Sequence, residues 1–328
     1  MLRYIFKRIL LSIPVLCGII VIVFTLMYIT PGDPAYTIAG ETVTPEMIEE
    51  IHEEYGLNDP YIVQLGHYFL NLLQGDLGES YITKQPVLNE ILARYPTTLR
   101  LAFSGVAIGI VIGIIAGVVS AVFQYSIFDK ILTMFSLFGI SAPSFWIAMI
   151  LVLGLSVKLG WLPPTGSYGP EYWIMPTFTL GLQASAYITR MTRSSMLEVI
   201  RQDYIRTARA KGQNEFVTVM KHALKNAMVP ISTTIGIQIC MFLAGSVLVE
   251  TVFALPGLGK YMVDSIGLKN YPVVMGTVVW IATNCVCINL IVDMVYCLFD
   301  PRMKEMYHRR KKRVKNKNSE GKAGVSVE

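Results

Sequence analysis

The chain has 328 residues, of which 53% are hydrophobic and only 16% are charged, and it carries a formal net charge of +5. Because a soluble domain has about 25% charged residues, this composition excludes an ordinary soluble protein. It predicts an all-α protein that crosses the membrane several times. The positive charge suits loops beside anionic membrane lipid rather than a nucleic-acid surface.

Six apolar runs are long enough to cross the hydrocarbon core of a bilayer as helices. They occupy residues 9–29, 99–123, 131–157, 173–189, 229–253 and 273–299. The fourth run is the weakest, because it is short and contains Pro176 near its start. The first run follows Arg3, Lys7 and Arg8, but it is longer than the apolar region of a signal peptide. We therefore expect it to be retained as a first membrane helix.

The distribution of lysine and arginine predicts the orientation of these helices. With residues 1–8 in the cytoplasm, the inner segments hold 22 of these basic residues and the outer segments hold six. This asymmetry is the positive-inside signal. It makes residues 30–97 an extracellular loop and residues 99–300 the membrane core. A cytoplasmic loop at 190–228 and a basic cytoplasmic tail at 301–328 complete the predicted organisation.

The outer segment at 30–97 carries signals for two short helices. Thr44 and Pro45 are typical of the cap and first position of a helix, and Gly56 is a stop signal. A second helix is expected to follow Asp59-Pro60 and to end at Gly75.

Two features inside the predicted spans concern packing and shape. Four glycines spaced four residues apart form one stripe on the second span, which favours close helix packing in the core or against another subunit. They are Gly105, Gly109, Gly113 and Gly117. In the third span, Pro143 removes a backbone donor and should kink the helix. Such a kink is found in gates and also in static bundles.

Four polar residues in the last two spans are candidates for a transport pathway. Glu250 lies close to the outer end of the fifth span, and Asp293 lies in the inner part of the sixth. An ionisable group in a span is a functional candidate by default, but both lie near an interface, which favours structural pairing with a neighbouring polar group over a transport role. Asn284 and Asn289 could hydrogen-bond across helices or line a polar path.

The cytoplasmic segment at 190–228 is too polar to enter lipid. Its residues 204–211 favour a helix, with Asp203 as the N-cap and Gly212 as the stop. We expect a second helix at 215–225, before Pro230 opens the fifth span. The segment could insert into a groove of a partner protein or lie on the lipid surface. Its candidate residues are Asp203, Tyr204, Arg206, Thr207, Ala208, Arg209, Ala210, Lys211, Gly212 and Glu215.

This segment resembles the EAA loop of permeases from binding-protein-dependent importers of the ATP-binding-cassette class. The resemblance is to the variant found in dipeptide, oligopeptide and nickel permeases. Arg206-Thr207-Ala208 stands where the general motif reads Glu-Ala-Ala, whereas Gly212 matches. Further pieces follow in the order of that family, at residues 31–34, 75–78, 96–99, 142–146 and 255–259. The basic tail is not part of the pattern.

The resemblance implies a type I importer permease of the bacterial plasma membrane, the first of two homologous permease subunits. It also implies two cassette ATPase subunits, which receive the cytoplasmic loop, and an extracellular substrate-binding protein. The solute would be a di- or oligopeptide, a nickel chelate or a glutathione-like molecule. ATP would be bound by the partner subunits, since this chain has no phosphate-loop motif; no catalysis and no cofactor or metal are expected of it.

Three interpretations remain open at this point. The outer helices could dock the binding protein or merely seal the mouth of the permease. An ion-driven secondary transporter would use Glu250 and Asp293 as its carriers. A membrane assembly factor without transport activity would use the acidic outer helices as its working surface. Neither of the last two explains the cytoplasmic loop.

Overall fold

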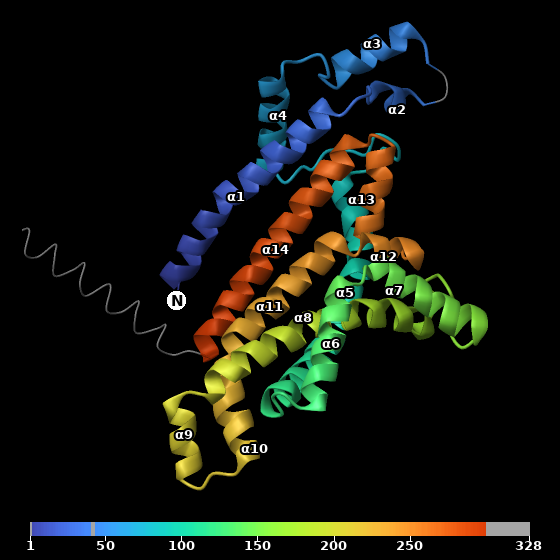
Figure 1. Ribbon diagram of the computed structural model, residues 1–328. Coiled ribbons are helices and arrows are strands. Elements are labelled where there is room, and N and C mark those ends of the chain that lie inside the picture. Colours follow the sequence, from blue (N-terminus) through green and yellow to red (C-terminus); the bar gives the residue numbers. More distant parts are fainter. Residues whose placement is uncertain (1, 41–42, 300–328) are drawn as a thin grey trace, which may run out of the picture.

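The computed structural model describes residues 2–40 and 43–299, so the predicted basic tail lies outside the described residues. Within these ranges the chain is helical, and its single β-type pairing is an isolated bridge between Glu79 and Pro86. Figure 1 shows long helices running between two groups of short ones. The group at one end is α2 (Ala35–Ala39), α3 (Pro45–Glu54) and α4 (Tyr61–Leu73), and the group at the other end is α9 (Asp203–Ala210) and α10 (Glu215–Val217).

Within the part of the chain that the structure describes, four helical stretches are long and apolar enough to cross a membrane, which confirms the predicted all-α polytopic class. They are Arg8–Ile29, Val87–Val122, Glu215–Ala244 and Tyr271–Met294. Three of these stretches lie within single helices, α1 (Leu2–Ile29), α5 (Val87–Val122) and α14 (Tyr271–Phe299), whereas Glu215–Ala244 begins before α11 (Leu224–Gly245) and ends within it. α5 begins in the outer segment and continues through Pro96, so the second span has an extension that its hydropathy did not predict.

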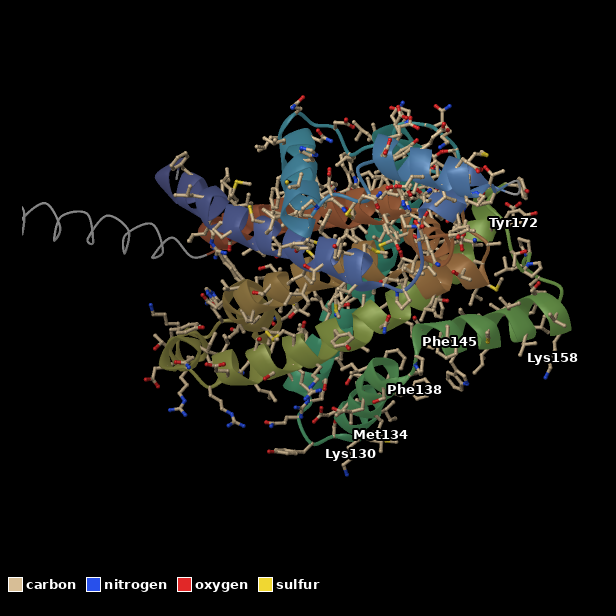
Figure 2. All side chains as sticks on the ribbon, turned by 90° about the horizontal axis from the view of Figure 1, so that it is seen from above. Lys130, Met134, Phe138, Phe145, Lys158 and Tyr172 are labelled. Atoms are coloured by element: carbon tan, nitrogen blue, oxygen red, sulfur yellow. The ribbon has the colours of Figure 1, made fainter. Side chains whose placement is uncertain are left out.

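The third predicted span is broken rather than kinked. α6 (Ile127–Ser141) stops before Pro143, and α7 (Ser144–Leu151) continues into a π-helical turn, Val152–Lys158. The two halves meet at 104°. Pro143 has extended backbone angles and immediately precedes α7, where it removes none of the hydrogen bonds of the new helix. Exposed side chains of this broken span, including Met134 and Phe138, point away from the other helices (Figure 2).

The weak fourth span is α8 (Ile174–Ile200), which follows a short 3₁₀ turn, Pro170–Trp173. By length and composition alone, α8 is not apolar enough to count among the membrane-crossing helices. The reason is its position, because 14 of its 27 residues are buried and α5, α6 and α11 pack against it. A helix that is shielded from lipid by its neighbours can carry threonines and serines. Pro176 lies in its first turn, where proline is tolerated.

The glycine stripe of α5 lies along its contact with α8. A Cβ atom added at Gly109 would come within 2.4 Å of the Cβ of Ala184, and one at Gly117 within 2.4 Å of the Cβ of Thr192. Carbon atoms do not approach so closely, so only glycine permits this separation of the two helices. The predicted close packing is therefore present within the chain.

Both helices predicted in the outer segment are present. The hydroxyl of Thr44 accepts the backbone N–H of Met47 at the start of α3, and Pro45 occupies the first position. Gly56 and Gly75 follow α3 and α4 with positive φ angles, which glycine adopts without strain. The short helix α2 was not predicted.

The helix observed at the fifth predicted span begins and ends at other residues than predicted. Pro230 lies inside α11 and does not open it. α10 continues through a π-helical turn, Thr218–Ala223, into α11, so the second helix predicted at 215–225 is an extension of the span. At the outer end the chain forms two short helices, α12 (Val247–Val252) and α13 (Leu258–Gly267). Glu250 therefore lies on α12, outside the long helix.

Replacement of Gly109 by valine should force α5 and α8 apart. We expect the Gly109→Val variant to lose about 1–3 kcal/mol of stability, the usual cost of overpacking a core. The measurement is thermal unfolding in detergent, with Gly18→Val in α1 as the control, because a Cβ at Gly18 meets no atom within 4 Å. Equal unfolding temperatures for the two variants would contradict the close-packing account.

Candidate coupling and pathway sites

The candidate coupling segment forms a helical hairpin that projects from the inner end of the bundle (Figure 1). Only Arg201 and Gln202 separate α8 from α9. Asp203 is the first residue of α9 rather than its cap, since Gln202 holds the cap position; its charge still favours the positive helix end. Gly212 follows α9 with a φ of +79°, in agreement with its predicted role as a stop.

One side of α9 is anchored and the other is exposed. Ile205 is fully buried and belongs to the main hydrophobic core. Ala208 is half-buried, and partial burial raises the pKa of Tyr204. The remaining candidate residues in this stretch are exposed: Asp203, Arg206, Thr207, Arg209, Ala210, Lys211 and Gly212. The core thus holds α9 through its apolar face and leaves its polar face free to meet a partner.

An ion pair closes the hairpin. The guanidinium of Arg209 donates to both carboxylate oxygens of Glu215, at 3.0 Å from Nε and 2.6 Å from Nη2. The side chain of Asn214 accepts the N–H of Phe216 and caps α10. Both members of the ion pair are partly exposed, so the pair defines the shape of the tip more than it stabilises the fold.

Phe216 is a feature of the tip that the sequence argument missed. Phe216 is 72% exposed, although the residues just before it in the hairpin, Asn214 and Glu215, are polar. A large exposed aromatic side chain surrounded by polar residues is typical of an interface anchor. The sequence did contain a signal that could have identified this residue, because it is an isolated aromatic residue in a polar loop.

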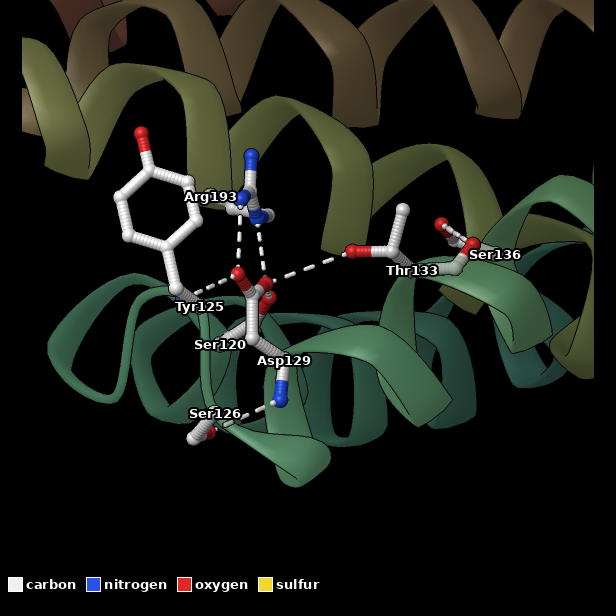
Figure 3. Close-up of polar contacts among 7 residues, drawn as sticks. All are labelled: Ser120, Tyr125, Ser126, Asp129, Thr133, Ser136 and Arg193. Carbon is white, nitrogen blue, oxygen red and sulfur yellow. Dashed lines mark hydrogen bonds and ion pairs between the residues drawn. The ribbon is translucent and has the colours of Figure 1, made fainter.

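A second missed feature joins the inner ends of three helices (Figure 3). Arg193 of α8 donates to both oxygens of Asp129 on α6, at 2.7 Å and 2.9 Å. The same carboxylate accepts the hydroxyl of Ser120 at the end of α5 and the backbone N–H of Tyr125. Asp129 is 4% exposed. We call Asp129, Arg193 and Ser120 the inner clamp, because they fasten α5 and α6 to α8 just before it leads into α9.

Glu250 holds the outer loops together. Its fully buried carboxylate accepts hydrogen bonds from Thr98 at 2.7 Å, from Ser246 at 2.8 Å and from the backbone N–H of Lys260 at 2.9 Å. A Cβ at Gly257 would lie 2.2 Å from the carboxyl carbon, so glycine is required where the loop passes over it. The sequence pieces at 96–99 and 255–259 therefore meet on this carboxylate. Neutral donors surround it, which favours a structural role.

The other pathway candidates do not converge with Glu250. Arg8 of α1 makes an ion pair with Asp293 of α14 at 3.1 Å, near the inner end of the molecule. The hydroxyl of Tyr95 donates to the side-chain oxygen of Asn284 at 2.5 Å. Asn289 is exposed, and Pro143 lies at the break between α6 and α7. These residues are spread over separate helices and both ends of the fold, so they do not form one site.

The described part of the chain contains no group of three or more His, Cys, Asp or Glu side chains that could hold a metal ion.

Two family descriptions cover nearly the whole chain. Residues 109–305 match the binding-protein-dependent transport system inner membrane component, and residues 1–102 match the N-terminal part of such a membrane component.

Curated relatives match along their full length. A dipeptide transport system permease protein of Alkalihalophilus pseudofirmus is 40% identical over 93% of this chain and 100% of its own length. A putative peptide transport system permease protein of Brucella abortus is 43% identical over 93% of this chain and 99% of its own length. A glutathione transport system permease protein of Escherichia coli is 39% identical, over 93% and 99%.

Solved structures share the fold. An inward-facing form of the MetNI methionine ABC transporter aligns with a TM-score of 0.54 and 20% identity, over 64% of this chain and 96% of that chain. A second form gives a TM-score of 0.52 over 65% and 97%. The fold, the family descriptions and the curated relatives agree with the resemblance noted in the sequence. The chain belongs to the family of inner membrane components of binding-protein-dependent transport systems.

Proposed function

We propose that this chain is one of two permease subunits in an ATP-driven importer of peptide-like solutes, and that a cassette ATPase seats on the α9–α10 hairpin. The observation that carries the proposal is the hairpin itself. It projects from the bundle, is held by the buried Ile205, and presents the exposed Phe216 next to a polar helix face. The names of the relatives support a peptide solute, since they are dipeptide, peptide and glutathione permeases.

In this proposal the chain performs no catalysis and binds no nucleotide or other cofactor. Its sequence contains no G-x-x-x-x-G-K-[S/T] motif, so ATP hydrolysis is assigned to two partner subunits. An extracellular binding protein would deliver the solute and select among peptides, nickel chelates and glutathione-like molecules.

The inner clamp suggests how motion at the hairpin would reach the membrane. α9 follows α8 almost directly, and Arg193 fastens α8 to the α5–α6 turn through Asp129. The glycine stripe then holds α5 against α8 along their length. The helices α5, α6 and α8 would therefore move as one block. The Arg8–Asp293 ion pair fastens α1 to α14, which would form the body against which the block rocks.

Removal of the Phe216 ring should weaken the contact with the ATPase. We expect Phe216→Ala to bind the ATPase subunit about tenfold more weakly, as for other aromatic interface anchors. The measurement is the amount of ATPase that co-purifies with the tagged chain in mild detergent. Tyr168→Ala is the matched control, because Tyr168 is 91% exposed in the outer loop between the third and fourth spans. Equal ATPase recovery with the two variants would argue against the hairpin as the docking surface.

The inner clamp can be removed without leaving a buried charge. The double variant Asp129→Asn/Arg193→Gln takes away both ions, whereas a single change would leave one uncompensated. In the assembled importer we expect ATP hydrolysis to stay within about twofold, while uptake falls about tenfold, because the docking surface is kept and its connection to α5 is weakened. Undiminished uptake in proteoliposomes, at normal abundance of the variant, would disprove this transmission role.

Glu250→Gln separates the importer from the ion-driven alternative. Glutamine replaces one of the two acceptor oxygens by a donor, so we expect a loss of about 1–3 kcal/mol of stability. Uptake per folded molecule should remain dependent on ATP and insensitive to an ionophore. Thermal unfolding and uptake are measured on the same preparation. An unchanged unfolding temperature together with abolished uptake would instead indicate an ion carrier at Glu250.

A further inference from the structure

A cavity of about 640 Å³ lies at the outer face, away from the coupling hairpin and the inner clamp. Its walls come from the outer end of α1, from the α3–α4 region, from the loop after α4 and from the start of α14. These elements meet at the end of the molecule opposite to α9 (Figure 1). Pockets for small organic molecules have volumes of about 300–1,000 Å³, so this cavity is of a suitable size.

The lining of the cavity combines acidic and aromatic side chains. Five tyrosines contribute to its walls: Tyr28, Tyr55, Tyr68, Tyr81 and Tyr271. Four carboxylates join them: Asp33, Asp59, Asp76 and Glu79. The described lining contains no lysine or arginine. Tyrosine rings and carboxylates together are the groups that recognise an organic cation, through cation–π contacts and ion pairing.

Part of this polar lining is already paired and part is not. Asp33 contacts His52 at 2.8 Å, and Asp76 accepts the backbone N–H of Gly78. Among the described residues, Asp59 and Glu79 make no side-chain hydrogen bond or ion pair. The hydroxyl of Tyr68 is buried without a hydrogen-bond partner, which is a costly state in a finished core. Unpaired acceptors and a buried hydroxyl at one cavity leave positions for a ligand.

Two ammonium groups of the chain lie near the rim. The Nζ atom of Lys84 is 5.6 Å from the centre of the Tyr55 ring, and Lys269 lies against Gly32. They reduce the negative charge of the rim without entering the lining. Lys84 also donates a hydrogen bond to the hydroxyl of Tyr55 at 3.4 Å, so this tyrosine of the lining is already in contact with an ammonium group of the chain.

We propose that this outer cavity is a binding site for a small organic cation that carries an ammonium or guanidinium group. A divalent metal fits the cavity less well, because the described residues bring no three His, Cys, Asp or Glu side chains together around one point. The carboxylates are spread around tyrosine rings, which suits an extended organic cation. The site does not depend on the proposed transport function, since it is formed by this chain alone.

The test is binding to the full chain in nanodiscs of zwitterionic lipid, measured by titration calorimetry. The probes are lysyl-lysine, a capped lysine with a free side-chain ammonium, and the capped norleucine that lacks this charge. We expect saturable binding of lysyl-lysine that weakens with salt, and no binding of capped norleucine. If capped lysine binds as tightly as lysyl-lysine, a lysine side chain of a docked protein is sufficient to occupy the site. Binding of lysyl-lysine alone would indicate a free solute, and both outcomes support the site.

Matched variants separate the cavity from general surface charge. Asp59→Asn/Glu79→Gln removes two unpaired lining charges with little change of shape, and should weaken lysyl-lysine binding about tenfold. Glu46→Gln/Glu50→Gln removes two exposed charges from α3 outside the cavity, and should leave the affinity within about twofold. Thermal unfolding confirms that both variants are folded. Absence of saturable binding, or equal weakening by both pairs, would overturn the proposal.

Discussion

The close contact between α5 and α8 is the constraint on which the rest of the fold depends. Four glycines remove side chains from one face of α5, so α8 can approach until a single added carbon would collide with it. α8 is thereby enclosed, and several of its threonines and serines are buried against neighbouring helices. In lipid the hydrophobic effect does not drive helices together, and such close packing supplies the contact energy instead.

This contact also aligns the two ends of the molecule. At the inner end, α8 leads into the α9–α10 hairpin and is fastened to the α5–α6 turn by Arg193. At the outer end, Thr98 of α5 donates to Glu250, which gathers the loops between α11 and α14. A displacement of the hairpin would therefore be passed along a packed block of helices. The outer cavity lies on the other side of the fold, among α1, α4 and α14.

Local sequence signals predicted those features that depend on a few neighbouring residues. Hydropathy located five of the apolar stretches, and the Thr44-Pro45 and Gly212 signals placed helix ends correctly. The inner clamp was missed because it depends on partners that are distant in the sequence. Asp129 and Arg193 are 64 residues apart, and nothing local distinguishes them from other charged residues near a span end. Pro143 predicted a bend but not its size, because the angle between α6 and α7 depends on how each half packs.

The central claim is that α9, α8 and the α5–α6 turn move as one body when the partner ATPases close. Pulsed electron paramagnetic resonance can test it in the assembled importer, after the native cysteines have been replaced. One pair of spin labels is placed at Ala210 and Phe128, and a second pair at Ala210 and Ile291. The account predicts that ATP leaves the first separation unchanged and alters the second. A change in the first separation with none in the second would contradict it.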